Sequence, residues 1–330
     1  MKKDLISIVV VNYNGKKWLK GCLDSFSDQT YKNFEIIFVD NNSIDESVDF
    51  VQENYKDIVI IKNDKNLGFG AANDIGVKSS QGEYLFFLNN DTESPSDMLE
   101  KLIKFKKDKN LNIVGPRIVN AKGIDPLDGS FLQLDVLASP GPGSRLFYVE
   151  GCSLIIGRDD FAKLGGFDEK YFMYSEDTDL CWRANLFGMR LGICEDTRLV
   201  HYGGGSSMET QAKTNQRHTT SSERRFWVES HNLRNMLKNY NAVNLLWTVP
   251  LFILQNSAES LVYLLTGNFK MCAIIWESYW WNVVNLFDSF KKRNMVQKNR
   301  IVSDRELFSL MYFGSYKFSA FKQIGLPKFK

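Results

Sequence analysis

The chain has 330 residues, of which 44% are hydrophobic, and this is enough to fill one large core or two moderate ones. A disordered protein is therefore excluded. The formal net charge of +2 hides an asymmetry, because residues 201–330 carry 17 Lys and Arg against 8 Asp and Glu. The basic, aromatic-rich back half fits an anionic membrane surface at least as well as a nucleic acid, and we expect no nucleic-acid partner.

The cysteines and the amino terminus favour a reducing, cytoplasmic setting. Five cysteines show neither a Cys-x-x-Cys spacing nor a nearby pair of histidines, which argues against a zinc site and a disulfide framework. Asp4 interrupts the short apolar run that follows the first lysines. We therefore expect a first β-strand at this end of the chain, not a signal peptide.

Residues 6–91 alternate short apolar runs with helical segments. Strands are expected at ISIVVVNY, FEIIFVDNNS, IVIIKN and EYLFFLNND, with helices at residues 16–26, up to Val51, and at 71–79. Strands rich in Ile, Val and Phe that alternate with helices of about ten residues are typical of a parallel sheet buried on both faces. The predicted fold class is α/β, and ligands are expected beyond the carboxyl ends of the strands.

Polar side chains follow three of these strands at the point where each strand ends. The three clusters are residues 12–14, 40–43 and 89–91. Asn, Asp and Ser are also ordinary turn formers and helix caps, so each cluster alone has a simple structural explanation. All three clusters together predict a site that is assembled at one edge of the sheet.

The middle of the chain is less regular. A helix is expected at residues 98–107, and the Gly, Pro and Asp content of residues 122–145 predicts a mobile loop that would serve as a lid or an acceptor platform. Ser175 and Gly188 are expected to bound a short helix with acids in its first turn. Such acids are common helix stabilisers, so they carry little functional information alone.

The back half is expected to be helical. Residues 243–266 hold an apolar stripe at helical spacing, formed by Trp247, Leu251, Leu254, Ala258, Leu261 and Leu265. The longest apolar run there is about ten residues, against roughly 20 for a membrane span, so a transmembrane helix is not expected. Residues 269–290 place three tryptophans near lysines, which predicts an interfacial helix. A helical subdomain packed on the sheet, or a dimer interface, would explain the same pattern.

The sequence contains neither a P-loop nor a complete dinucleotide-binding turn. No Gly-Lys-Ser/Thr follows a Gly-rich turn, so a P-loop is not indicated. The run GFGAAN, from Gly68 to Asn73, has Asn where a dinucleotide-binding turn needs a third Gly or Ala, and it follows the third strand instead of the first. A nicotinamide enzyme is therefore not predicted, although a Gly-rich turn before a helix can approach a phosphate closely.

Asp91, Asp177 and His201 are candidates for joint chemistry. A divalent cation that bridges phosphate oxygens needs hard ligands and usually keeps water or substrate oxygens in its other positions. One carboxylate, one imidazole and a diphosphate would suffice, which leaves Asp177 as a general base. Each residue also has a simpler explanation: Asp91 as a helix cap, His201 as a surface or core histidine, and Asp177 as an acid that complements a helix dipole.

Six motifs appear in order over residues 5–207: ISIVVVNYNG, FVDNNSIDES, NLGFGAANDIG, YLFFLNNDT, GGFDEKYFMYSEDTDLCWR and VHYGGGSS. Together they resemble family 2 glycosyltransferases, particularly the rhamnosyltransferase-like branch that builds surface polysaccharides. The C-terminal region is similar to that branch more loosely. The resemblance implies a GT-A fold and an inverting, metal-assisted transfer of rhamnose or another hexose from a nucleoside-diphosphate donor, dTDP- or UDP-linked, to a hydroxyl group of an acceptor.

The same resemblance implies roles for individual residues. The donor-binding residues would be Val11, Tyr13, Asp40, Gly68, Asn73, Asn89 and Asn90. Asp91 and His201 would hold a Mg²⁺ or Mn²⁺ ion. Asn89 departs from the family pattern, because many relatives have the first Asp of an Asp-x-Asp motif there, and the loss of one charge should weaken metal affinity.

The acidic motifs would supply the catalytic groups. Glu176 and Asp177 match the family's Glu-Asp pair, with Asp177 as the expected general base. Asp168 and Glu169 in GGFDE would lie on the acceptor side or be structural.

We expect a catalytic, nucleotide-sugar-binding GT-A domain at residues 1–207 and a helical, amphipathic region at 208–330 that contacts a membrane surface or forms a homo-oligomer. The acceptor would be a saccharide or a polyprenyl-linked saccharide at the cytoplasmic face of the cell membrane. Two other functions remain open: a catalytically silent subunit that binds sugar nucleotide or polysaccharide, and a sugar nucleotidyltransferase.

Overall fold

The computed structural model describes residues 1–203, 219–325 and 328–329, which form two compact units. The first unit comprises Met1–Gly129, Tyr148–Leu180 and Met189–Ala212, and the second comprises Ser130–Phe147, Cys181–Gly188 and Lys213–Lys330. The domain boundary expected at residue 207 lies outside the described residues, as do residues 204–207 of the VHYGGGSS motif.

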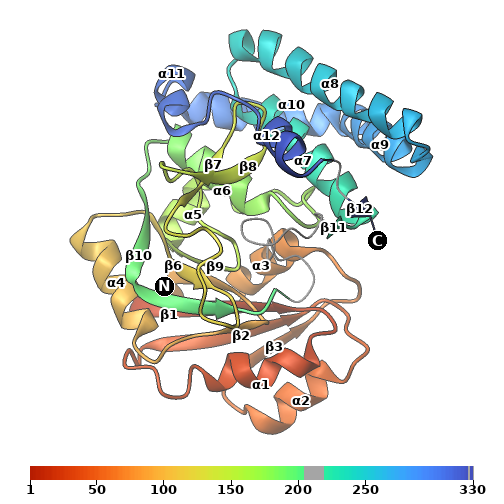
Figure 1. The fold of residues 1–330 in the computed structure, drawn as a ribbon. Coiled ribbons are helices and arrows are strands. Elements are labelled where there is room, and N and C mark those ends of the chain that lie inside the picture. Colours follow the sequence, from red (N-terminus) through yellow and green to blue (C-terminus); the bar gives the residue numbers. More distant parts are fainter. Residues whose placement is uncertain (204–218, 326–327, 330) are drawn as a thin grey trace. The chain divides into compact units, whose positions relative to one another are not determined.

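The first unit is built around an eight-stranded sheet with the order β3-β2-β1-β4-β9-β6-β10-β5 (Figure 1). The strands are β1 (Lys2–Asn12), β2 (Phe34–Asp40), β3 (Val59–Lys62), β4 (Gly82–Asn89), β5 (Thr92–Glu93), β6 (Ile113–Val119), β9 (Ser153–Gly157) and β10 (Leu191–His201). The first four strands pair in parallel, as do β6 and β10, whereas β9 and β5 run antiparallel to their neighbours. The predicted α/β class with a mostly parallel sheet is confirmed.

Short helices connect these strands. They are α1 (Lys16–Asp24), α2 (Ser47–Asn54), α3 (Phe69–Lys78), α4 (Met98–Asp108) and α5 (Arg158–Leu164). The central strands are fully buried, as the paired residues Val10 of β1 and Leu88 of β4 illustrate. Burying one such side chain contributes about 1.5–3 kcal/mol, which explains why the strands read as continuous apolar runs.

The strand order brings the carboxyl ends of β2, β1 and β4 next to one another. From β1 the chain adds β2 and then β3 on one side of β1 within the sheet, and it then crosses back to place β4 on the other side of β1. Open α/β sheets bind ligands beyond the strand ends at such a change of direction. The register pairs Asn12 with Asp40. It also pairs Val11, the residue before Asn12, with Asn89. The three polar clusters therefore begin at neighbouring positions on adjacent strands.

Residues 122–145 are not simply the mobile loop that their composition predicts. In the second unit, β7 (Phe131–Leu134) and β8 (Pro140–Gly143) form a two-stranded antiparallel sheet. The buried Asp135 carboxylate accepts two backbone N–H groups of the turn between them. Proline is tolerated in β8 because this strand has only one neighbour, so composition alone was misleading here.

Helices dominate the second unit. They are α7 (Ser222–Asn239), α8 (Ala242–Leu265), α9 (Phe269–Val284), α10 (Leu286–Asn299), α11 (Asp304–Leu307) and α12 (Tyr316–Ile324), with a 3₁₀ turn at Phe308–Leu310 and the strand pair β11 (Thr219–Thr220) and β12 (Lys328–Phe329). The single helix expected at 269–290 is two helices that meet at Asn285. None of the described helices combines the length and apolar character that crossing a bilayer requires.

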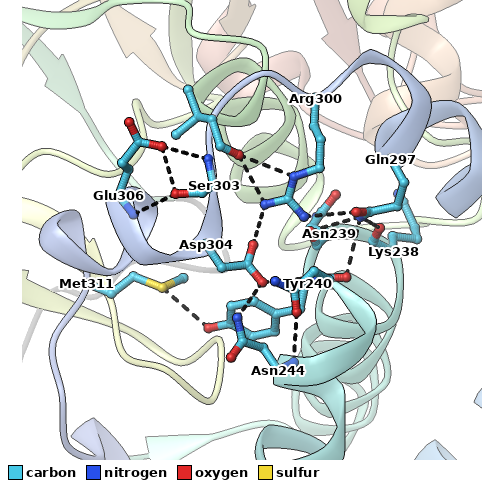
Figure 2. A network of polar contacts seen from close by, with 12 residues as sticks. Lys238, Asn239, Tyr240, Asn244, Gln297, Arg300, Ser303, Asp304, Glu306 and Met311 are labelled. Carbon is cyan, nitrogen blue, oxygen red and sulfur yellow. Dashed lines mark hydrogen bonds and ion pairs between the residues drawn. The ribbon is translucent and has the colours of Figure 1, made fainter.

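A polar network fixes the ends of several of these helices (Figure 2). Asp304 Oδ2 accepts Asn244 Nδ2 at 2.6 Å, and its other oxygen pairs with Arg300. Gln297 Nε2 donates to the carbonyl oxygen of Asn239 at 3.1 Å, where α7 ends. Such bonds satisfy the carbonyl groups that a helix terminus leaves unpaired, and they hold α7, α10 and α11 together.

Candidate active site

The polar side chains at the ends of β1, β2 and β4 form one hydrogen-bonded network. Asn12 Nδ2 donates to Asp40 Oδ1 and to Ser43 Oγ, each at 3.0 Å. Asn90 Nδ2 donates to Asn12 Oδ1 at 2.6 Å. The second oxygen of Asp40 accepts the backbone N–H of Ser43 at 2.8 Å. The structure therefore brings together residues from all three clusters that the sequence pattern singled out.

Val11 and Tyr13 flank this network at the end of β1. Val11 is half-buried in the strand, whereas the Tyr13 side chain is 53% exposed just beyond it. An exposed aromatic ring beside fixed polar groups can stack on a nucleobase. The surroundings of these two residues are thus compatible with the base of a nucleotide.

The Gly-rich turn before α3 depends on the backbone freedom of glycine. Gly68 has φ +82°, and an added Cβ would lie only 2.0 Å from the carbonyl oxygen of Phe172. Asn41 Nδ2 fixes the turn by donating to the Gly68 carbonyl oxygen at 3.1 Å. Asn73 does not join the exposed polar groups, because its fully buried amide donates to the Phe69 carbonyl oxygen within α3.

Asp91 and His201 form a close pair. Their Oδ1 and Nε2 atoms are 3.2 Å apart, and the pairing of Thr92 with His201 between β5 and β10 holds them in register. Asn89 Nδ2 is 3.4 Å from the same His201 nitrogen. Two ligands that each lie about 2.1 Å from an octahedral ion are roughly 3 Å apart, so this pair fits one divalent cation.

Charge around this pair is concentrated on Asp91. No group of three potential His, Cys, Asp or Glu ligands gathers within residues 1–203, 219–325 and 328–329, so water or substrate oxygens would have to complete a metal site. Burial opposes protonation of His201, but Cys152 in its thiolate form and the Asp91 carboxylate act in the other direction and raise the pKa of His201 above its ordinary value. Burial also raises the pKa of the Cys152 thiol to about 11, which leaves Asp91 as the anionic partner at neutral pH. Metal binding would displace the proton from His201.

The second acidic group begins helix α6 (Glu176–Leu186), as the sequence predicts. Asp177 is half-buried, and its Oδ2 accepts the backbone N–H of Gly151 at 2.9 Å. Its Oδ1 accepts the backbone N–H of Thr178 at 2.7 Å. The carboxylate is therefore held in place by two main-chain groups.

Glu176 and Asp177 differ in protonation. Burial and the adjacent Asp177 carboxylate raise the pKa of Glu176 to about 8, and Glu176 Oε2 has no hydrogen-bond partner among the described residues. Burial also raises the pKa of Asp177, but its N–H donors act in the opposite direction. Near neutral pH, Glu176 is thus mainly protonated, and Asp177 is the member of the pair whose ionised form receives backbone N–H donors.

A short segment that sequence reasoning missed, Glu150–Cys152, connects the acid pair to the end of β4. The Cys152 carbonyl oxygen accepts the backbone N–H of Asn89 at 3.0 Å, while Gly151 donates to Asp177. Burial raises the pKa of Glu150 to about 7, an effect that His201 opposes and Asp177 reinforces. The only sequence signal was an acid and a glycine between two apolar runs, which is too common to indicate a site.

The GGFDE motif packs against α3. Phe167 contacts Phe69 and lies in the core, and its backbone N–H donates to Asp74 Oδ1 at 3.2 Å. Asp168 is buried and accepts a backbone N–H from two residues further on. Glu169 is exposed. The two acids that were expected on the acceptor side therefore occupy different environments.

Comparison with known proteins identifies relatives in glycan biosynthesis. A family model described as Glycosyl transferase family 2 matches residues 7–150. The low-salt glycan biosynthesis hexosyltransferase Agl10 of Haloferax volcanii is 28% identical over 213 residues, which are 60% of this chain and 67% of that protein. The amylovoran biosynthesis glycosyltransferase AmsB of Erwinia amylovora is 29% identical over 205 residues, 58% of this chain and 67% of the relative. The match to the O-antigen biosynthesis protein RfbC of Myxococcus xanthus covers only 17% of that longer protein.

Solved structures share the fold at low sequence identity. TarS of S. aureus in complex with UDP superposes with a TM-score of 0.53 and 17% identity over 71% of this chain and 66% of its own. GalNAc-T7 with UDP, GalNAc and Mn²⁺ gives a TM-score of 0.65 and 14% identity over 98% of this chain and 58% of its own. The expected GT-A fold is thereby confirmed. Residues 7–150 match the Glycosyl transferase family 2 model, which identifies this part of the chain as a family 2 glycosyltransferase domain.

Proposed function

We propose that this chain is an inverting hexosyltransferase that moves rhamnose or another hexose from a dTDP- or UDP-linked donor to an acceptor hydroxyl group. One observation carries the proposal. The connecting segment Glu150–Cys152 hydrogen-bonds to the end of β4 through one residue and to Asp177 through the adjacent residue. Because neighbouring Cα atoms are about 3.8 Å apart, a candidate base lies beside the strand end that carries Asn89, Asn90 and Asp91.

Asp177 is the proposed general base. It removes the proton of the acceptor hydroxyl group as that oxygen attacks the anomeric carbon from the side opposite the leaving group. The bond between the anomeric carbon and the diphosphate oxygen breaks, and the configuration inverts. A base that acts in this way needs to be ionised but not too weak, and the raised pKa of Asp177 suits that requirement. The mainly protonated Glu176 limits repulsion beside it.

The strand-end network is the proposed donor site. Tyr13 would stack on the base and Asp40 would contact its polar edge, with Val11 beneath it. Asn89, Asn90 and the Gly68 turn would face the ribose and phosphates. Fixed, partly buried amides favour this role, because they can bond a polar ligand without first being ordered.

Asp91 and His201 are the proposed ligands of a Mg²⁺ or Mn²⁺ ion. Their 3.2 Å separation and the hardness of a carboxylate support the assignment. A bound divalent cation supplies positive charge that neutralises the diphosphate as it departs.

The acceptor is proposed to be a saccharide or a polyprenyl-linked saccharide at the cytoplasmic face of the cell membrane, with Asp168 and Glu169 nearest the acceptor side. Support comes from the functions of two relatives, which concern low-salt glycan biosynthesis and amylovoran biosynthesis. The exposed apolar residues of α8 and α9 also favour a lipid environment. The helical region at 208–330 would then provide membrane contact or an oligomer interface.

A donor screen tests the proposal. The purified chain is incubated with dTDP- and UDP-sugars and Mg²⁺ or Mn²⁺, and released nucleoside diphosphate is measured with and without saccharide acceptors. Transfer, or slow hydrolysis that releases nucleoside diphosphate, is expected. Pyrophosphate release would indicate a nucleotidyltransferase instead, and donor binding without any turnover would indicate a silent binding subunit.

A further inference from the structure

Helix α8 presents its apolar residues to the outside. Every exposed side chain of this helix is apolar, and the exposed set includes Val243, Leu246, Leu254, Leu261, Leu264 and Leu265. At about 100° per residue these six fall within an arc of roughly 100°, so they form one continuous strip along the helix. We call this strip, with the exposed residues between its members, the outer face of α8.

The opposite side of α8 is buried and combines polar residues with the aromatic residues Phe252 and Tyr263. Asn256 and Ser260 are buried, and Glu259 pairs with Arg225 of α7 and with Lys317 of α12. An ordinary surface helix shows its polar side to water, whereas the exposed side of α8 is apolar.

The buried ion pairs keep α8 in this orientation. Burial opposes ionisation of Glu259, yet Lys317 and Arg225 outweigh it and lower the pKa of Glu259 to about 2. Asn256 Nδ2 also donates to the buried Glu229 at 2.8 Å. Turning the helix to hide its leucines would strip these charges of their partners, and removing one partner of a buried pair is strongly destabilising. The outer face is therefore a fixed feature of the fold.

Helices α9 and α10 carry exposed aromatic residues of their own. Helix α9 lies beside α8 (Figure 1), and Trp276 Nε1 donates to Ser260 Oγ at 3.2 Å, which sets its partly exposed ring next to α8. Trp280 is 68% exposed and Phe287, at the start of α10, is 95% exposed. Tryptophan is enriched where proteins meet the boundary between lipid and water.

The charges around this surface are mainly positive. Lys270 and Lys291 are exposed, whereas Glu277 is the one exposed acid in residues 242–299, all of which the structure describes. Lysine and arginine side chains near an anionic bilayer are attracted to it electrostatically.

An apolar pocket adjoins the outer face. It has a volume of about 380 Å³ and is lined by Val136, Leu137, Leu251, Leu254 and Ala258, together with Gln255, Gly314 and Ser315. Leu251 and Leu254 also belong to the exposed side of α8. The pocket is therefore accessible to an acyl chain of a lipid layer that contacts the outer face of α8.

We propose that the outer face of α8, together with Trp276 and Trp280, docks on an anionic lipid surface with the helix axis in the plane of the membrane. The polar side of the helix stays satisfied within the protein, so no backbone or charge has to enter the hydrocarbon unpaired. This inference deepens the proposed function and rests on it in one respect: a lipid-linked acceptor would be met at this surface.

Vesicle binding by the full chain tests the inference. Wild type is expected to co-float with vesicles made of equal parts phosphatidylglycerol and phosphatidylcholine. The double variant Leu261→Glu/Leu265→Glu should lose about tenfold or more in vesicle affinity, because it places two charges in the lipid-facing strip. Ile124→Glu is the matched control, since Ile124 is 52% exposed and Leu261 is 54% exposed. The control should bind the vesicles like wild type.

Release of nucleoside diphosphate from a soluble donor, in the absence of vesicles, separates the two proposals. Unchanged release by the double variant with lost vesicle binding supports lipid docking. Vesicle binding without any donor turnover by wild type would overturn the proposed function and leave the docking intact. Failure of wild type to bind the vesicles overturns the docking. A wild-type dimer that becomes monomeric in the double variant, without vesicle binding, would show that a second copy covers the face.

Discussion

Gly151 and Asp177 are in direct contact: the Gly151 N–H donates to Asp177 Oδ2 at 2.9 Å, and an added Cβ on Gly151 would lie 3.1 Å from the Asp177 Cβ. The same Cβ would lie 3.4 Å from Phe69 Cε1. A side chain at this position would fit only if Asp177 or its neighbours shifted by a few tenths of an ångström. The position of the proposed base is thus set by a glycine in a segment that carries no recognisable motif.

Gly151→Ala should reduce turnover without preventing folding. The new methyl group must displace Asp177 by a few tenths of an ångström, and misplacing a reacting group can cost up to about 100-fold in rate. We expect kcat to fall roughly 10- to 100-fold while the KM for the donor changes little. Gly157→Ala, at the end of β9, is the matched control, because its nearest contact is 3.4 Å away. Equal kinetics for the two variants would show that Gly151 does not position the base.

Asp177→Asn tests the base itself. The amide keeps the size of the side chain but cannot take a proton, so turnover should fall by about 10²- to 10⁴-fold while donor affinity, measured by calorimetry, stays close to that of wild type. Asp159→Asn is the control, because Asp159 is an exposed acid in the first turn of α5. If Asp177 only complements a helix dipole, both variants should retain activity and lose a similar, small amount of stability.

Glu176→Gln should change how stability depends on pH. The folded-state pKa of Glu176 is about 8, against an ordinary value of 4.5, so the folded protein holds this proton more tightly than the unfolded chain does. The resulting stability is complete below pH 4.5 and is lost as the pH rises towards 8. The neutral amide of Gln does not titrate, so the variant should gain thermal stability relative to wild type between pH 5 and 8. If the melting temperatures of the two proteins changed with pH by the same amount across that range, Glu176 would not be a buried carboxyl group that keeps its proton.

The strand-end network could be predicted from the sequence because two simple rules meet there. Continuous apolar runs such as the one ending at Asn89 indicate buried parallel strands, and the carboxyl ends of such strands share one edge. The connecting segment Glu150–Cys152 could not be predicted, because it depends on β9 entering the sheet antiparallel to β4. A short apolar run has the same sequence pattern whether the strand is parallel or antiparallel to its neighbour. The sequence therefore does not indicate that the amino-terminal end of β9 lies at the site.

Helix α8 shows a different limit of sequence reasoning. The spacing of Leu251, Leu254 and Leu261 correctly indicates that they share one face of a helix. Periodicity does not reveal what covers that face, and the structure leaves it exposed while Asn256 is buried. The partners that decide this, Arg225 and Lys317, lie in helices distant in sequence, and no local pattern links them to α8.

Variants of Asp91, His201 and Asn89 test the proposed metal site. His201→Ala or Asp91→Ala should raise the Mn²⁺ concentration needed for half-maximal UDP binding by roughly tenfold or more, because each removes one of two protein ligands. Asn89→Asp should lower that concentration, since it adds an anionic oxygen where Asn89 Nδ2 now lies 3.4 Å from His201 Nε2.

Calorimetric titration of Mn²⁺ in the presence of UDP measures these effects, with Asp97→Asn as a control on an exposed acid that pairs with Lys101. UDP binding that is indifferent both to a chelator and to His201→Ala would refute the site. An unchanged response in Asn89→Asp alone would mean that this side chain does not face the ion. In that case the charge missing from the motif would have to come from the donor diphosphate, because Asp91 is the only anion that the motif supplies.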